Sequence, residues 1–224
     1  MRIVTFNVQH GRTPGGAVDT ATLARFCAEM EPDLLALQEV DLHLRRSGRA
    51  DQAAVVARAA GMTGVFGAAR RLGIWGRYGN ALVVRGRVLD VETLRLPRLG
   101  RRERRAALVA SVEVVGRRLS VAATHLSTEH DDGVAQLGVL LRALGARPAP
   151  RLVLGDLNLR PDRAVPALEA AGYLVASAAE PTYPAAGPFL RIDHVAVQGL
   201  EIGRVVVLGA APVSDHRPLL VEAR

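Results

Sequence analysis

Short strand-like runs recur along the whole chain and constrain its fold more than any other feature of the sequence. The runs are rich in Val, Leu and Ile and cover residues 3–8, 34–38, 80–85, 88–96, 106–115, 119–125, 151–154, 191–197, 203–208 and 218–221. Gly86-Arg87 and Gly116-Arg117 each separate two runs in the manner of hairpin turns. Hairpins join antiparallel strands, so they argue against a purely parallel sheet.

Four helical patterns interrupt these runs, over residues 19–30, 51–60, 131–144 and 163–171. Asp19 or Thr20 can cap the start of the first helix and Pro32 follows its end, while Gly61, Gly145 and Gly172 close the others. Helices that cover mixed sheets around one core predict a layered α/β or α+β sandwich. We find no linker, low-complexity tract or internal repeat, and we expect one domain over residues 1–224.

The composition indicates a globular protein, because 49% of the residues are hydrophobic and 23% are charged. No apolar stretch approaches the roughly 18–20 residues that a membrane span needs. Residues 1–7 read as a strand and lack the features of a signal peptide. We therefore expect a cytoplasmic protein without a membrane span. The single cysteine, Cys27, excludes an internal disulfide and a cysteine-based zinc site.

The charge of the chain favours phosphate-bearing partners. Its 29 basic residues are all arginines, and they outnumber the 22 acidic residues to give a formal net charge of +7. Guanidinium groups bind phosphate oxygens in a bidentate fork. Bulk charge alone does not identify the partner.

Polar side chains stand where the apolar runs end. Leu35, Leu37 and Glu39 alternate on one face of a strand, so an apolar face ends in a carboxylate. Asp156 and Asn158 are two residues apart, so an extended backbone would point both the same way. The other polar residues at such positions are Asn7, His125, Asp193 and the triplet Ser214-Asp215-His216.

Each of these residues alone has an ordinary structural explanation, such as a turn, a helix cap, a solvated strand end or an ion pair with arginine. Together they supply carboxylates, amides and imidazoles in one ordered set. Independent turns would not be expected to supply that combination, whose carboxylates suit a hard divalent cation.

The ordered set resembles the endonuclease/exonuclease/phosphatase superfamily, the metal-dependent phosphoesterases that include DNase I-like nucleases. The resemblance runs from residue 3 to residue 219, and the fairly specific part is Gly155-Asp156-Leu157-Asn158 followed by Ser214-Asp215-His216-Arg217-Pro218. It implies an α+β fold with four layers, in which two mixed sheets pack face to face with helices outside. It also implies a hydrolase of phosphodiester or phosphomonoester bonds.

The resemblance implies a role for each strand-end residue. Glu39 would bind Mg²⁺ or Mn²⁺, with Asn7 beside it and Asp215 completing the metal set. His216 would be the general base and Asp193 would orient its ring.

Three further residues would serve catalysis. Asp156 would position the attacking water or accept its proton itself, so the choice between Asp156 and His216 as proton acceptor stays open. His125 and Asn158 would contact phosphate oxygens.

Four residues are weaker candidates for substrate binding. Asn80 and Tyr78 lie in a segment that matches the family, and His10 follows the strand of Asn7. Arg105 ends the basic run of residues 98–105, which is a solvated loop or a contact for an anionic substrate.

A second basic stretch contains one tryptophan. Trp75 lies close to Arg70, Arg71 and Arg77, and it is a platform for a nucleic-acid base or a packing anchor.

The sequence favours a phosphodiesterase of the nuclease type, because a basic chain gains affinity for a nucleic-acid backbone. The partner is then a phosphate-containing substrate, with DNA and RNA as candidates, and no obligate protein partner is expected. One alternative is a phosphatase or phosphodiesterase that acts on a small molecule or a lipid head group. A second alternative is a catalytically silent member that binds nucleic acid.

Overall fold

The computed structural model describes residues 1–98, 102–176, 178 and 180–224, and its strands form two mixed six-stranded sheets. The first sheet has the order β11-β12-β1-β2-β4-β3. Its strands are β1 (Arg2–Asn7), β2 (Leu34–Leu42), β3 (Thr63–Leu72), β4 (Gly76–Val84), β11 (Ile202–Val207) and β12 (Leu219–Ala223). The second has the order β5-β6-β7-β8-β10-β9. Its strands are β5 (Gly86–Arg95), β6 (Ala106–Val114), β7 (Arg117–His125), β8 (Arg151–Asp156), β9 (Leu174–Ala176) and β10 (Asp193–Gln198).

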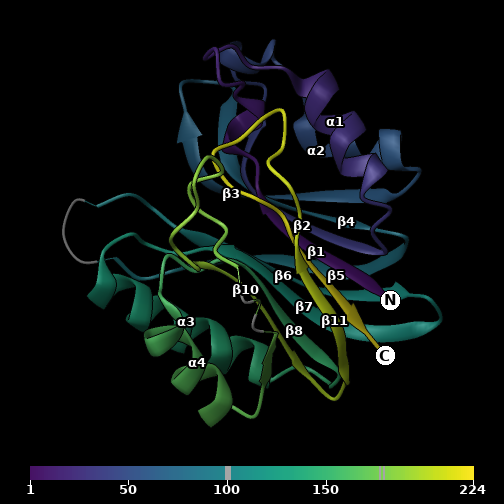
Figure 1. Ribbon diagram of the computed structural model, residues 1–224, viewed down its shortest axis with the longest axis vertical. Helices are drawn as coiled ribbons and strands as arrows, with labels where there is room; N and C mark the ends of the chain where they lie inside the picture. Colours follow the sequence, from purple (N-terminus) through teal and green to yellow (C-terminus); the bar gives the residue numbers. More distant parts are fainter. Residues whose placement is uncertain (99–101, 177, 179) are drawn as a thin grey trace.

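Helices cover the outer face of each sheet (Figure 1). The helices α1 (Thr20–Glu29) and α2 (Gln52–Ala60) pack on the first sheet, and α3 (His130–Gly145) and α4 (Pro161–Ala170) pack on the second. Two short 3₁₀ helices, η1 (Gln9–Gly11) and η2 (Arg45–Ser47), follow β1 and β2. The expected four-layer α+β sandwich is confirmed. No helix in the described part of the chain is both long and apolar enough to cross a membrane.

Alternation along the strands builds three layers of core. Leu34 and Ala36 of β2 belong to the cluster between the two sheets, whereas Leu35 and Leu37 belong to the cluster under α1 and α2. All four side chains are fully buried. Burial of one such leucine contributes about 1.5–3 kcal/mol to the stability of the fold. Because both faces of β2 are apolar, this strand is stable only with a layer packed on each side.

The first two helices begin and end where the sequence predicts. The Asp19 side chain accepts a hydrogen bond from the backbone N–H of Thr22, and the Asp51 side chain accepts one from Ala54. Gly61 closes α2 in the left-handed conformation, with φ of 64°.

Two strands carry no clear sequence signal. β3 is an edge strand with a partly exposed surface, and glycines and arginines interrupt its apolar residues. β9 has three residues. The helix predicted over residues 163–171 begins two residues earlier, because Pro161 suits the first turn of α4. Of the basic run over residues 98–105, residues 99–101 lie outside the described part of the chain.

The strand register gathers the polar strand ends at one edge of the sandwich. In the first sheet Asn7 pairs with Gln38, one residue before Glu39. In the second sheet Asp156 pairs with His125 on one side and with Asp193 on the other. The ends of β1, β2, β7 and β8 and the start of β10 therefore share this edge, and both chain termini lie at the opposite end (Figure 1).

Candidate active site

A pocket of about 400 Å³ opens where these strand ends meet. Residues from both sheets and their loops line it, so it exists only when the two sheets are packed together. The lining residues are Asn7, Glu39, Arg105, His125, Thr128, Asp156, Asn158, Arg160, Tyr183, Leu190, Ile192, Asp215 and His216. The structure thus brings together eight of the twelve site residues predicted from the sequence, and a ninth, Asp193, lies directly against His216.

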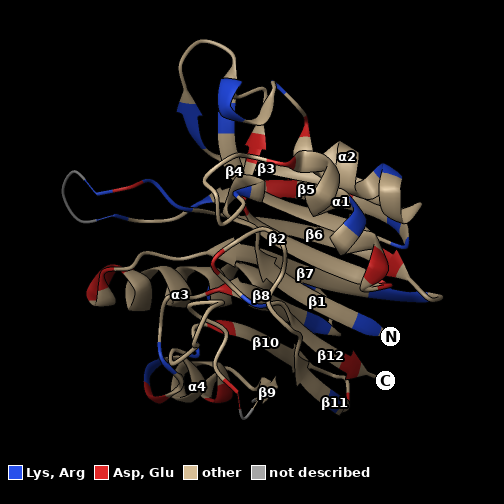
Figure 2. Ribbon diagram, turned by 45° about the horizontal axis from the view of Figure 1, so that its top comes forward, with Lys and Arg blue, Asp and Glu red and all other residues tan. Residues whose placement is uncertain are grey.

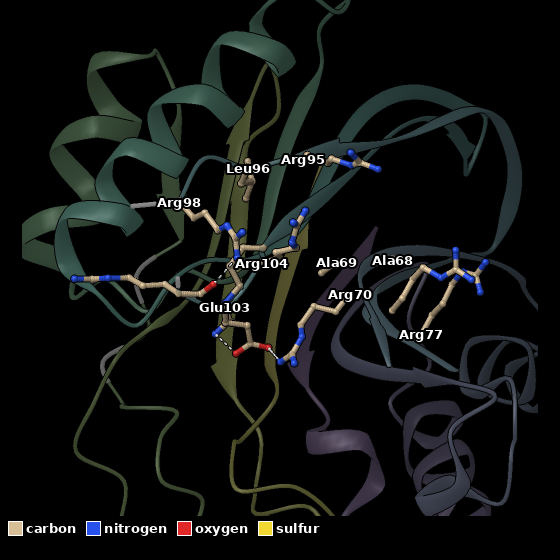
Figure 3. Close-up of a pocket in the computed structure, with 12 residues that line it drawn as sticks. Ala68, Ala69, Arg70, Arg77, Arg95, Leu96, Arg98, Glu103 and Arg104 are labelled. Atoms are coloured by element: carbon tan, nitrogen blue, oxygen red, sulfur yellow. Dashed lines mark hydrogen bonds and ion pairs between the residues drawn. The ribbon is translucent and has the colours of Figure 1, made fainter. Parts of the chain in front are cut away.

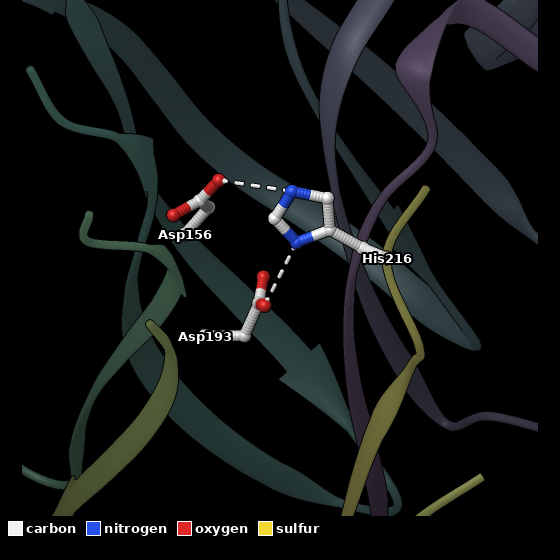
Figure 4. Close-up of side chains that lie close together, drawn as sticks. All are labelled: Asp156, Asp193 and His216. Carbon is white, nitrogen blue, oxygen red and sulfur yellow. Dashed lines mark hydrogen bonds and ion pairs between the residues drawn. The ribbon is translucent and has the colours of Figure 1, made fainter. Parts of the chain in front are cut away.

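His216 lies between two carboxylates (Figure 4). Its Nδ1 is 2.9 Å from Oδ2 of Asp193, and its Nε2 is 3.7 Å from Oδ2 of Asp156. An ionised carboxylate can only accept a hydrogen bond, so Nδ1 carries the proton toward Asp193. All three side chains are almost completely buried, and the Tyr183 ring packs on the imidazole with its centroid 4.7 Å away.

This arrangement shifts the proton affinity of both His216 and Asp156. Burial lowers the pKa of His216, but the charge and the hydrogen bond of Asp193, together with the charges of Asp156 and Asp215, outweigh burial and raise it to about 9. Burial and the neighbouring charge of Asp193 raise the pKa of Asp156 to about 7. The two groups interact closely enough to titrate as a pair.

Asn7 connects the two sheets at the floor of the pocket. Its Nδ2 donates to Oδ2 of Asp156 over 3.0 Å and to Oε1 of Glu39 over 3.3 Å. Its Oδ1 accepts from the backbone N–H of Gln9. The amide of Asn7 therefore orients one carboxylate from each sheet.

A β-bulge directs Glu39 toward the pocket. The pairing of β2 with β4 shifts register between Leu37 and Val40, and Glu39 has a φ of 61°. Val40, not Glu39, joins Leu35 and Leu37 in the cluster under the helices. The simple alternation expected from the sequence is therefore wrong at this point, and the bulge takes Glu39 off the helix-covered face.

A turn, not an extended strand, places Asn158 beside Asp156. The backbone N–H of Asn158 donates to Oδ1 of Asp156 over 2.9 Å, and Asn158 has a φ of 51°. Both side chains line the pocket, as expected, although the sequence-based reason was wrong. Gly155 has a φ of 154°, and an added Cβ would collide with the backbone carbonyl of Thr124. Glycine therefore lets β8 approach β7 just before Asp156.

Arg105 and His125 form a buried pair at the side of the pocket. Nη1 of Arg105 donates to Nδ1 of His125 over 3.0 Å, and Nε2 of His125 lies 3.5 Å from Oδ2 of Asp156. Burial lowers the pKa of His125 well below its usual value, and the positive charges of Arg105 and His216 add to the effect. His125 is therefore neutral at pH 7.

The loop before β12 carries Asp215 to the rim. Its carboxylate accepts a hydrogen bond from Nε2 of Gln9 over 2.9 Å. The hydroxyl of Ser214 donates to the backbone carbonyl of Asn7 and accepts from the backbone N–H of His216 over 3.0 Å. Ser214 thus ties this loop to β1 and sets the position of the two residues that follow it.

Three predicted substrate contacts lie outside the pocket lining, and their roles stay predictions. Asn80 is buried, and its Nδ2 donates to the carbonyl of Ala106 in the facing sheet over 2.7 Å. Tyr78 neighbours Glu39, and burial together with that charge raises its pKa. His10 in η1 is half-buried, and burial lowers its pKa.

Several pocket residues escape the sequence reasoning. Tyr183 belongs to an irregular segment without periodicity, so its contact with His216 has no local signal. Thr128 and Arg160 follow His125 and Asn158 in the chain. Because each lies within three residues of a predicted site residue in the sequence, this closeness could have identified them.

Two groups of donors could hold a divalent cation. Asp156, Asp193 and His216 offer ligand atoms that all lie within 4.8 Å of one another. The second group is Glu39 and Asp215, whose carboxylates line the open pocket and offer oxygen atoms alone, with the Asn7 amide donating to Glu39 beside them. Mg²⁺ and Mn²⁺ prefer oxygen ligands, and Nδ1 of His216 already donates to Asp193. The second group therefore suits such a cation better.

The charges of the site also fit a cation. Glu39, Asp156, Asp193 and Asp215 place four carboxylates in or against one pocket. The raised pKa of Asp156 reflects burial and the negative charge close to it. A bound divalent cation would neutralise part of this excess.

Comparison with known proteins gives the same fold along the whole chain. The sequence model of the Endonuclease/Exonuclease/phosphatase family matches residues 4–216. No protein with a curated description matches the sequence.

Three solved structures illustrate the structural likeness. An endonuclease/exonuclease/phosphatase from Beutenbergia cavernae has a TM-score of 0.79 at 22% identity, covering 100% of this chain and 71% of that one. The mannosyl-6-phosphatase Bt3783 of Bacteroides thetaiotaomicron also has a TM-score of 0.79, at 14% identity, with 100% and 99% covered. The human Nocturnin catalytic domain, solved with a sulfate anion, has a TM-score of 0.74 at 20% identity, with 100% and 93% covered.

Proposed function

Because the chain belongs to the endonuclease/exonuclease/phosphatase family, it is a hydrolase of phosphate ester bonds, and we propose that it is a phosphodiesterase of the nuclease type. The observation that carries the proposal is the convergence of Glu39, Asn7, Asp156 and His216 on one pocket. The net charge of +7 and the two arginines in the pocket lining, Arg105 and Arg160, favour a polyanionic substrate.

The family is divalent-metal-dependent, and in this chain Glu39 would hold the ion, with Asn7 and Asp215 beside it. When bound, Mg²⁺ or Mn²⁺ supplies charge that polarises the P–O bond and stabilises the leaving oxygen. Tyr78 and Asn7 neighbour the Glu39 carboxylate and orient it.

Asp156 accepts the proton of the attacking water, and the charged imidazole of His216 holds its carboxylate in place. Oδ2 of Asp156 faces Nε2 of His216, and Asn7 donates to the same oxygen. Asp193 holds the other ring nitrogen and so fixes the orientation of the imidazole. With its pKa raised to about 9, the imidazole already carries a proton on both nitrogens at pH 7, so the Asp156 carboxylate, whose pKa is raised to about 7, takes the proton from water.

His125 and Asn158 provide hydrogen-bond donors for the phosphate oxygens. Nδ1 of His125 accepts from Arg105, so the proton of the neutral ring lies on Nε2, the nitrogen nearer Asp156. Asn158 lines the same pocket, and its backbone is held by Asp156. Donors aimed at developing negative charge lower the barrier of phosphoryl transfer.

A second candidate is a phosphatase that acts on a small phosphorylated molecule. The structural likeness to the mannosyl-6-phosphatase favours it, because that chain is covered almost completely. A pocket of about 400 Å³ also has room for a single sugar phosphate.

A substrate panel tests the proposal. The purified protein is incubated with Mg²⁺ or Mn²⁺ and with plasmid DNA, abasic DNA, RNA, bis(4-nitrophenyl) phosphate, 4-nitrophenyl phosphate or a phospholipid. We expect hydrolysis of nucleic acid and of the aryl diester, and EDTA abolishes it. Hydrolysis of the monoester alone would instead establish the phosphatase.

A further inference from the structure

A large basic groove adjoins the pocket on the side of β3 and β5. Its volume is about 910 Å³, and eight arginines and one glutamate line it among the described residues. These side chains carry a formal charge of +7, as large as the net charge of the whole chain. We call this feature the arginine groove.

Two edge strands and their extensions form the arginine groove. Arg70, Arg71 and Arg77 come from the hairpin of β3 and β4, and the other arginines come from the end of β5 and the segment before β6. Figure 2 shows arginines on both projecting segments, and Figure 3 shows Arg70 and Glu103 paired between them. The groove therefore lies between the edges of the two sheets.

Most of this positive charge is not neutralised. Glu103 pairs with Arg70 at 2.9 Å and with Arg105 at 3.7 Å, and Arg102 pairs with Glu129 at 2.6 Å. The remaining five have no carboxylate partner among residues 1–98, 102–176, 178 and 180–224, and they are Arg71, Arg77, Arg95, Arg98 and Arg104. Electrostatic repulsion among so many arginines raises the free energy of the unoccupied groove. A bound anionic ligand reduces this repulsion.

Arg105 links the arginine groove to the hydrolytic pocket. It lines both, and its guanidinium donates to His125 inside the pocket. A ligand in the groove would therefore be continuous with a phosphate ester in the pocket. One small phosphate needs only one or two arginines, whereas a chain of phosphates can use all of them.

An exposed tryptophan lies at the end of the same hairpin. Trp75 is 77% exposed and follows Ile74 in the turn between β3 and β4, two residues before Arg77. An exposed aromatic ring two residues from an arginine of the groove suits an unpaired base, because stacking on an aromatic ring accompanies phosphate contacts in single-strand binding.

We propose that the arginine groove binds the single-stranded nucleic acid whose scissile phosphate enters the pocket, and that Trp75 stacks on one of its bases. The proposal rests on the phosphodiesterase proposed above and specifies its substrate. An anionic membrane is the competing partner, but its flat surface fits a concave groove less well than a strand does.

The test measures binding of a fluorescein-labelled single-stranded oligonucleotide of about 16 nucleotides by fluorescence anisotropy. The buffer contains EDTA, so that cleavage does not interfere. The groove variant Arg71→Glu/Arg95→Glu reverses one exposed charge on each side. The control variant Arg117→Glu/Arg118→Glu makes the same charge change in β7, at exposed positions far from the groove.

We expect the groove variant to bind about 10-fold more weakly or worse. The slope of log K against the logarithm of the salt concentration should become shallower by about 1.4, which corresponds to two lost phosphate contacts. Trp75→Ala should weaken binding about 5-fold or more. In Mg²⁺, the groove variant should lower kcat/KM for the oligonucleotide relative to that for bis(4-nitrophenyl) phosphate by about the same factor as binding. The control variant should bind the oligonucleotide like the unmodified protein.

Equal losses in the groove and control variants would overturn the proposal, and so would unchanged binding in the groove variant. Binding to phosphatidylserine-containing vesicles without binding to the oligonucleotide would identify a membrane instead. The outcome is separate from that of the proposed function, because binding in EDTA needs no hydrolysis. A protein that hydrolyses no ester but binds the oligonucleotide through the groove would refute only the phosphodiesterase.

Discussion

Nη1 of Arg105 donates a hydrogen bond to Nδ1 of His125 over 3.0 Å, and this contact decides which nitrogen of the imidazole carries the proton. A guanidinium has donors only, so Nδ1 must present its lone pair and Nε2 must carry the hydrogen. Burial and then the charge of Arg105 lower the pKa of His125. The pair therefore holds a neutral N–H donor in the pocket at neutral pH.

Arg105→Ala should remove this control. We expect kcat/KM for bis(4-nitrophenyl) phosphate to fall about 10- to 100-fold and the pKa of His125 to rise, because a positive neighbour is lost. Imidazole NMR shifts report the tautomer and the pKa directly. Arg105→Lys should recover part of the activity, and Arg87→Ala, an exposed control in β5, should have no effect. An unchanged tautomer in Arg105→Ala would contradict the assignment.

Glu39→Ala and His216→Ala should each lower the hydrolysis rate at least about 100-fold. The Glu39 variant would lose the cation, and the His216 variant would lose the imidazole that faces the Asp156 carboxylate. His130→Ala is the matched control, because His130 is exposed at the start of α3. Full activity in Glu39→Ala or in His216→Ala would refute the site, provided that circular dichroism shows a folded protein.

Asn80→Ala should destabilise the protein because Asn80 joins the two sheets. Its donor satisfies the buried carbonyl of Ala106, which otherwise keeps only a 3.4 Å contact from the hydroxyl of Thr124. An unsatisfied buried carbonyl costs about 1–3 kcal/mol, which urea unfolding can measure. A rise in KM with no loss of stability would instead support the substrate contact predicted from the sequence.

Acid should weaken the fold through His194. Its ring is buried, its Nε2 donates to the carbonyl of Leu159 over 2.8 Å, and burial lowers its pKa from 6.5. The unfolded chain then binds more protons than the folded chain below pH 6.5, so stability is complete above that pH and is lost as the pH falls. The loss from one such group reaches up to about 1.4 kcal/mol at pH 5.5.

Urea unfolding at pH 7.5 and pH 5.5 in EDTA measures this loss. His194→Gln should show a smaller difference between the two pH values than the unmodified protein, although its stability at pH 7.5 is lower. His130→Gln changes an exposed histidine and should keep the full difference. Identical pH dependence in all three proteins would exclude His194 as the cause.

The sequence predicts the architecture well where apolar periodicity and caps are strong. Leu34 to Leu37 form one strand with two apolar faces, and Asp19 and Asp51 cap their helices. It fails at β3, because an edge strand such as Thr63–Leu72 needs no continuous apolar run when one side faces solvent.

The geometry of the site is harder to predict than its composition. The type of residue needed for phosphate chemistry is visible at each strand end, but the bulge at Glu39 and the turn at Asn158 depend on backbone conformations that tertiary packing imposes. The contact between Tyr183 and His216 joins an irregular segment to a loop far along the chain. Neither segment has a local pattern that would reveal it.

Replacing one carboxylate in each of the two groups of donors shows which group holds the cation. A cation that binds only the folded chain stabilises it by about 2.7 kcal/mol at 100 times its Kd, and this raises the Tm by about 5–10 °C for a chain of this size. Glu39→Gln should abolish the rise in Tm with Mn²⁺, because Glu39 lines the open pocket. Asp193→Asn should keep most of it, because Asp193 is occupied by His216. Asp131→Asn removes an exposed carboxylate and should keep the whole rise. Loss of the rise in Asp193→Asn but not in Glu39→Gln would place the cation among Asp156, Asp193 and His216 instead.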